Sequence, residues 1–172
     1  MYTLAPEEKA TTIIAYSASS LIRGDVVTRE NARVSVWLRM DGVPDFLGIH
    51  NANIINLAGA QARPASYDEI MIPVTSLIGF HIAPPAHDRL DYDVQESNRT
   101  NIPFGVLMGV FFVKGHIRIP AQSNVATKIS TARMPWMSIY EAEISSPHIP
   151  QMPVIQVPML IVRPSAVSFV IR

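Results

Sequence analysis

Short segments in which apolar and polar residues alternate, separated by turn-forming residues, run along most of the 172-residue chain. Alternation with a period of two, in segments rich in β-branched and aromatic residues, is typical of half-buried β-strands. The pattern predicts strands over residues 11–16, 21–27, 46–55, 69–74, 77–82, 102–107, 111–119, 137–144, 157–162 and 166–171. Residues 33–39 and 123–133 fit a short helix almost as well as a strand, and residues 58–66 are predicted to form a loop. The chain is therefore expected to be all-β.

The order of these segments repeats once along the chain. Residues 22–26 and 113–117 share the pattern apolar-basic-Gly-polar-apolar, which places Gly24 and Gly115 at the same point. Further matches follow in order: Val34 with Val125, Pro44 with Pro135, residues 49–54 with 139–144, and residues 76–82 with 165–171. The interval is about 90 residues, longer than the usual periods of solenoids and propellers. We interpret the pattern as an internal duplication, and the alternative is chance similarity between two β-rich halves.

The duplication predicts three regions. Residues 1–82 form the first β unit, residues 83–101 a linker, and residues 102–172 the second β unit. The linker contains Pro84 and Pro85, and six of its 19 residues are charged. Because prolines and charges do not suit a buried strand, we expect this region to be exposed and to contain no long helix or central strand.

Each unit is expected to contain a hairpin bent at Gly24 or Gly115, a variable connector, a long strand, and two strands separated by a short break. This order resembles that of Sm-like small β-barrels, and the connector is similar to that of uncharacterised bacterial domains of unknown function. The resemblance extends over both units and depends on strand order, without a diagnostic motif. It implies two fused five-stranded Sm-like barrels related by internal duplication.

Sm proteins that bind RNA do so as rings, through the loops after their second and fourth strands. The loop after the fourth strand is only residues 75–76 in the first unit and residues 163–165 in the second. The first of these loops lacks an arginine that could bind a base. This departure from the Sm pattern argues against RNA binding.

Composition changes the picture because charged residues are only 16% of the chain, whereas a typical domain has about 25%. Apolar residues are 48%, so the chain is expected either to bury more surface than one domain does or to assemble with copies of itself. The absence of cysteine excludes disulfides, thiolate metal sites and cysteine nucleophiles. Residues 104–113, the most apolar run, are too few to span a bilayer, and residues 1–8 do not resemble a signal peptide. We expect a cytoplasmic protein without a membrane partner.

The net charge is zero, but it is unevenly distributed: residues 1–82 carry −2, residues 83–101 carry −2 and residues 102–172 carry +4. A basic second unit could attract a polyanion, or it could bind the acidic part of another copy. The candidate nucleic-acid contacts are Lys114, Arg118, Lys128, Arg133 and Arg163. The candidate interface residues are Trp37, Trp136, Asp25 and His116, of which the last two occupy equivalent positions after the repeat glycines. Asp25 and His116 either pair with each other or are unrelated surface residues.

Candidate chemistry is sparse. The five histidines have no metal-binding spacing, and His50 and His81 are expected to face solvent or a partner from their strands. No phosphate-binding loop, nucleophile elbow or dinucleotide fingerprint occurs, so no catalytic residue, metal or cofactor is assigned. We expect a non-catalytic scaffold protein that forms a homo-oligomer, either a ring or a filament. The alternative is a nucleic-acid or nucleotide-binding module that uses the basic second unit.

Overall fold

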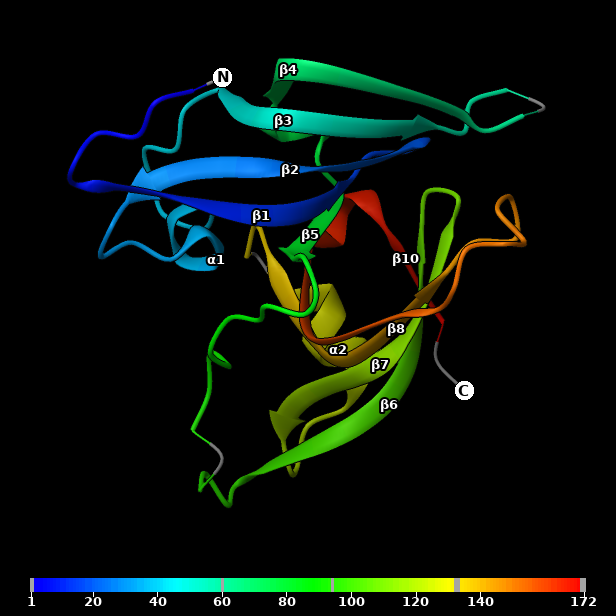
Figure 1. Ribbon diagram of the computed structural model, residues 1–172. Coiled ribbons are helices and arrows are strands. Elements are labelled where there is room, and N and C mark those ends of the chain that lie inside the picture. Colours follow the sequence, from blue (N-terminus) through cyan, green and yellow to red (C-terminus); the bar gives the residue numbers. More distant parts are fainter. Residues whose placement is uncertain (1, 60, 94, 132–133, 171–172) are drawn as a thin grey trace. The chain divides into compact units, whose positions relative to one another are not determined.

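The structure is a computed structural model that describes residues 2–59, 61–93, 95–131 and 134–170 (Figure 1). The predicted all-β class is confirmed, because strands account for most of the regular structure in these ranges. The chain divides into two compact units, Met1–Asp88 and Arg89–Arg172. The elements of the first unit are β1 (Glu8–Tyr16), β2 (Ser20–Arg29), α1 (Val34–Trp37), β3 (Phe46–Asn56), β4 (Arg63–Pro73), η1 (Val74–Ser76) and β5 (Gly79–Ile82). Those of the second unit are β6 (Arg99–Met108), β7 (Phe111–Pro120), α2 (Val125–Thr131), β8 (Met137–Ser145), β9 (Ile155–Val162), η2 (Pro164–Ala166) and β10 (Ser168–Val170).

In the first unit the strands are antiparallel and lie in the order β5-β1-β2-β3-β4. Alternation directs one set of side chains inward, and Ile13, Val26, Ile49 and Ala52 from the three central strands are fully or almost fully buried. Leu38, which follows α1, is also buried, so the connector after the first hairpin contributes to the core.

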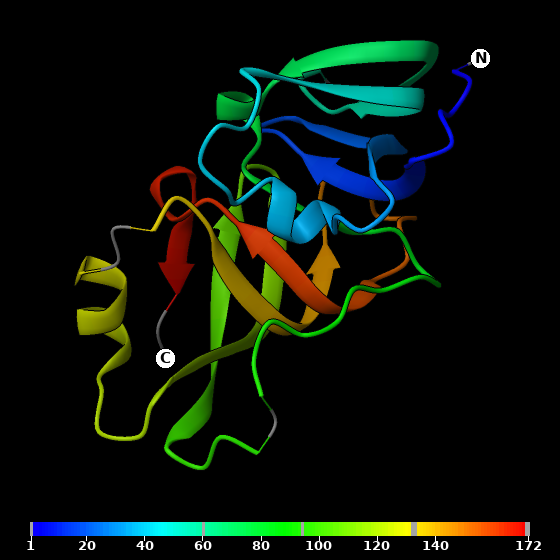
Figure 2. The ribbon, with the colours of Figure 1, turned by 90° about the vertical axis from the view of Figure 1, so that its left-hand side faces the viewer.

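The second unit has the equivalent order, β10-β6-β7-β8-β9, again antiparallel. Its buried positions include Phe104, Ile117, Ile139 and Ala142. The connector forms α2, which lies to the side of the strands in Figure 2. Each of the two segments for which the sequence left strand and helix open therefore contains a helix, α1 or α2.

The two units also share the register of their ladders. Ile13 lies opposite Gly24 in the first hairpin, as Phe104 lies opposite Gly115 in the second. Phe80 and Phe169 also occupy equivalent places, since Phe80 lies opposite Ala15 and Phe169 opposite Val106. These correspondences match the repeat alignment.

The repeat glycines stand where two strands approach closely. A β-bulge lies at each glycine, where the ladder register shifts between residues 23 and 25 and between residues 114 and 116. A Cβ atom at Gly24 would be 2.5 Å from Cγ2 of Ile49, and one at Gly115 would be 2.6 Å from Cγ2 of Ile139. The backbone carbonyl oxygen of the next residue lies almost as near in each unit, so no other residue type fits without displacement of the backbone.

The predicted loop over residues 58–66 is corrected in part. Residues 63–66 are not loop, because β4 begins at Arg63 and pairs with β3 over its whole length. β4 is the outermost strand of the unit and pairs with β3 on one side only. Pro64 is tolerated in such an edge strand, because proline has no N–H to donate to a second ladder.

The predicted closed barrels are also not observed. In the described ranges no ladder joins the fourth strand of a unit to its fifth, so the strands of each unit form an open series. The fifth strands are short, four residues in β5 and three in β10, whereas β4 has 11 residues. The described helices include none that is long and apolar enough to cross a membrane.

Candidate functional site

The edge strand β4 is the most exposed regular element of the first unit. Nine of its 11 residues are exposed, among them Tyr67 at 54% and Met71 at 55%. Phe46, which lies opposite Pro73 at the other end of the β3–β4 ladder, is 51% exposed. A long edge strand with exposed large side chains is a template for pairing with another chain. We call this element the β4 edge.

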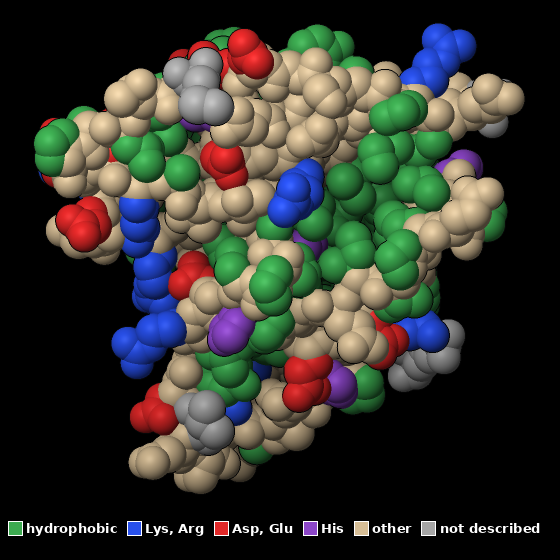
Figure 3. All heavy atoms as spheres, in the orientation of Figure 1, with side chains coloured by type: hydrophobic (Ala, Val, Ile, Leu, Met, Phe, Trp, Pro, Cys, Tyr) green, Lys and Arg blue, Asp and Glu red, His purple; other side chains and the backbone are tan. Residues whose placement is uncertain are grey.

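The β4 edge also has three exposed charged residues, Arg63, Asp68 and Glu69. On the face drawn in Figure 3, apolar side chains form patches, and charged side chains are scattered between them. By unit, residues 1–88 carry six basic and nine acidic side chains, a net −3, and residues 89–172 carry eight and five, a net +3.

The structure gives Asp25 and His116 a partner each within their own units. Asp25 accepts hydrogen bonds from the Thr12 hydroxyl at 2.6 Å and the Asn51 amide at 3.0 Å. Burial raises the pKa of Asp25, but these hydrogen bonds and the nearby positive charge of Arg23 together lower its net pKa. In the second unit, Nδ1 of His116 lies 3.0 Å from Oε2 of Glu141.

The two partners themselves occupy equivalent strained positions. Asn51 has φ 49° and Glu141 has φ 50°, both in the left-handed region at the bulge opposite the repeat glycine. Each side chain is thereby turned toward the residue that follows the glycine. Local backbone geometry therefore determines both contacts, and a pairing of Asp25 with His116 stays a prediction.

The five basic candidates do not act as one group. Arg118 has only 8% of its side chain exposed, and it donates hydrogen bonds to the carbonyl oxygens of Asp93 and Glu96 at 3.1 and 2.8 Å. Its guanidinium also lies 4.3 Å from the centre of the Tyr92 ring. Arg118 thus anchors the segment before β6, and few of its donors are accessible to a ligand.

Of the remaining basic candidates, Arg163 lies over the Trp136 ring at 4.4 Å, and partial burial lowers the pKa of its guanidinium. Lys128 is half-buried on α2, and Arg133 lies outside the described residues. Lys114 is exposed on β7. Among the described basic candidates, Lys114 is therefore the accessible side chain on a strand.

The tryptophans differ in accessibility. Trp136 is 5% exposed beneath Arg163, while Trp37 is half-buried at the end of α1. Trp37 is thus the more accessible of the two as a candidate interface residue.

A buried polar pair in the first unit was not predicted from the sequence. His81 is 2% exposed and does not face solvent: its Nδ1 lies 2.8 Å from the Ile82 carbonyl oxygen, and its Nε2 lies 2.9 Å from the Tyr16 hydroxyl. The carbonyl can only accept, so Nδ1 carries the proton and Nε2 accepts from Tyr16. Burial lowers the pKa of His81 to about 4 and raises that of Tyr16. In the sequence, only the apolar neighbours of His81 indicated that this side chain is buried.

A partly buried polar cluster fastens the segment before β6 to the rest of the second unit. Asp91 accepts hydrogen bonds from the hydroxyls of Ser138 and Tyr140 at 2.6 and 2.7 Å. The Tyr92 ring meets the Tyr140 ring edge-on, with centroids 4.8 Å apart. Part of the predicted linker is therefore packed against β8, although its charge suggested full exposure.

Within the described ranges, no group of three or more His, Cys, Asp or Glu side chains is arranged to hold a metal ion. Comparison of the chain with protein-family models, with curated proteins and with solved structures finds no match. The function must therefore be argued from the molecule itself.

Proposed function

We propose that this protein is a non-catalytic structural protein, built from two duplicated Sm-like units, that assembles with copies of itself. The observation that carries the proposal is the β4 edge, 11 residues long and largely exposed. The common strand order and register of the two units support the duplication.

The proposed contact is head-to-tail: the β4 edge of one copy adds to β10, the outermost strand next to β6, in the following copy. Different surfaces meet in such a contact, so repetition closes into a ring or continues as a filament. Residues 65–72 of β4 contain no proline, which leaves backbone groups available for a new ladder.

Charge and apolar surface have separate roles in this proposal. The net −3 of residues 1–88 and the net +3 of residues 89–172 favour contacts between unlike units. Exposed ion pairs contribute only about 0–1 kcal/mol each. Apolar side chains such as Tyr67 and Met71 therefore supply most of the affinity, and added salt is expected to weaken assembly only slightly.

The test is the mass in solution, measured by light scattering at micromolar concentration. We expect a multiple of 19.0 kDa for the native chain and a smaller mass for the double variant Tyr67→Lys/Met71→Lys, which places charges on the β4 edge. Met40→Lys is the matched control, because Met40 is 60% exposed and lies outside β4.

A native protein that stays a monomer at every protein and salt concentration would refute self-assembly. If the native chain assembles and the double variant does so equally well, assembly uses another surface and the assignment of the β4 edge is wrong.

A further inference from the structure

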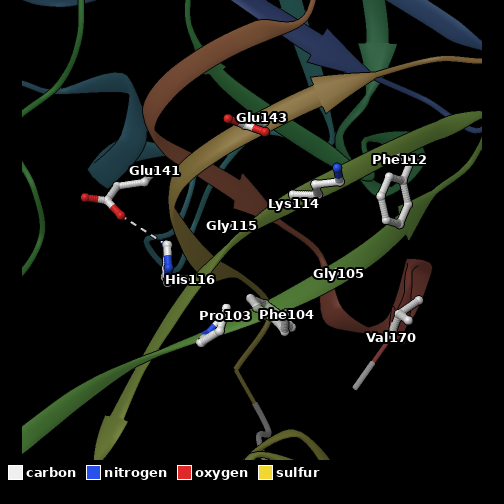
Figure 4. A pocket seen from close by; sticks show the side chains of 10 residues that line it. All are labelled: Pro103, Phe104, Gly105, Phe112, Lys114, Gly115, His116, Glu141, Glu143 and Val170. Carbon is white, nitrogen blue, oxygen red and sulfur yellow. Dashed lines mark ion pairs between the residues drawn. The ribbon is translucent and has the colours of Figure 1, made fainter. Parts of the chain in front are cut away.

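The second unit has a pocket of about 570 Å³ on the face of β7 that is turned away from its core (Figure 4). Its apolar part consists of Pro103, Phe104 and Gly105 of β6, Phe112 of β7 and Val170 of β10. The volume lies within the range of about 300–1,000 Å³ that is usual for small-molecule sites.

One of the lining positions that differ between the two units is Gly105. Gly105 lies opposite Lys114 in its ladder, and the equivalent ladder position in the first unit pairs Ile14 with Arg23. A Cβ atom at position 105 would already be 3.3 Å from Cβ of Val170 and 3.4 Å from the Phe112 ring. A side chain as large as isoleucine there would therefore occupy the pocket.

Two opposite charges lie side by side at the rim. Lys114 and Glu143 are directly opposite each other in the β7–β8 ladder, and both line the pocket. Nevertheless they form no ion pair, and no acidic group of the described chain lies within 4 Å of the Lys114 ammonium. Glu143 accepts one long hydrogen bond, 3.4 Å, from Gln156. Both groups therefore remain able to bind a ligand.

His116 and Glu141 contribute the other ionisable side chains of the rim. His116 and Glu141 lie 3.0 Å apart and flank Lys114 on the side away from Phe112 (Figure 4). A simple anion would meet the carboxylates of Glu141 and Glu143 as well as Lys114, and a simple cation would be repelled by Lys114. Directly opposed side chains such as Lys114 and Glu143 have Cβ atoms about 4.5–5.5 Å apart. A small zwitterion can therefore reach both charges at once.

We propose that this pocket binds a free α-amino acid with an aromatic or branched apolar side chain. The α-carboxylate binds the Lys114 ammonium, and the α-ammonium binds the Glu143 carboxylate. The side chain lies in the apolar part of the pocket, against the Phe112 ring and Val170. The site lies wholly within the second unit and is formed by a single chain, although its Val170 belongs to β10, the strand that the proposed assembly contact would join.

Saturation-transfer-difference NMR tests the proposal with L-phenylalanine as the probe, because this method observes the ligand and tolerates an assembly of any size. We expect a saturable signal on the ring protons. N-acetyl-L-phenylalanine lacks the ammonium group and phenethylamine lacks the carboxylate, so each should bind about tenfold more weakly or worse, as expected for loss of one charged hydrogen bond.

Variants locate the site. Lys114→Met and Glu143→Gln should each weaken binding about tenfold, and Gly105→Ile should abolish it by filling the hollow. Arg23→Met is the matched control, because Arg23 is the ladder equivalent of Lys114 in the first unit and should leave binding unchanged.

Three results would overturn the proposal. They are the absence of a saturable signal up to about 10 mM ligand, equal binding of the two analogues and phenylalanine, and a Lys114→Met variant that binds like the native chain. Lys114 is exposed on the strand surface, so its replacement tests the site even if Gly105→Ile does not fold.

Discussion

The buried Tyr16–His81 pair makes the stability of the first unit depend on pH. The pKa of His81 is about 4 in the folded chain, against 6.5 for an unperturbed histidine. The unfolded chain therefore binds a proton more readily than the folded chain, so protonation favours unfolding. Stability is complete above about pH 7 and is lost as the pH falls from 6.5 toward 4. A difference of 2.5 pKa units corresponds to about 3 kcal/mol at 1.36 kcal/mol per unit.

The assay is urea unfolding at a series of pH values between 8 and 4, followed by the fluorescence of Trp37. A Trp136→Phe background makes Trp37 the sole tryptophan, so the signal comes from the unit that contains His81. The comparison is His81→Gln, which keeps an acceptor for Tyr16 and does not titrate in this range. We expect the stability advantage of the native chain over this variant to shrink by about 3 kcal/mol between pH 8 and pH 4.

Carboxylates titrate over part of the same range, but their contribution is common to both proteins and cancels in the difference. His87→Gln serves as the control, because His87 is exposed and its replacement should leave the pH dependence intact. Parallel pH profiles for the native chain and His81→Gln would refute the reasoning, since the buried imidazole would then not be the titrating group.

Four further substitutions test contacts within the two units. Gly24→Ala and Gly115→Ala should each lower stability by about 1–3 kcal/mol or more, measured by urea unfolding, because the new methyl group overlaps a buried isoleucine and a carbonyl oxygen; full native stability in either variant would contradict the close approach. Tyr140→Phe removes the hydrogen bond to Asp91 and should cost about 1 kcal/mol by the same assay, and an unchanged free energy of unfolding would contradict this contact. Glu141→Asn should leave stability unchanged or raise it slightly, because asparagine tolerates the positive φ at this position; a loss above about 1 kcal/mol would show that the contact with His116 outweighs the backbone strain.

The chemical properties of the residues in each strand were sufficient to predict most of the strands. Alternation over residues 111–119 and 137–144 could arise only from elements with one buried face, and both strands are present. The repeated glycines were also informative, because a glycine within a strand pattern indicates a bulge or a close backbone approach. Both bulges occur at these glycines, in the same register in the two units.

The edge of the first unit was harder to predict. Residues 63–66 contain proline, alanine and serine and resemble a loop locally, but the β3 ladder holds them in a strand. Pairing energy from a neighbouring strand overrides a weak local preference, and only the three-dimensional arrangement supplies that neighbour. The same arrangement determines that β4 is outermost and therefore available for assembly.

Contacts between residues far apart in the sequence were decided by tertiary structure alone. His81 and Tyr16 are 65 residues apart, and Asp91 and Tyr140 are 49 apart, so no local pattern relates them. The same holds for the pocket, where a glycine, a lysine and a glutamate come from three strands. The sequence alone determined which residues alternate and where the chain bends, because those properties depend on neighbours along the chain. Which polar groups are buried together, and which charges remain unpaired, depends on strands brought side by side, and the folded structure alone decides it.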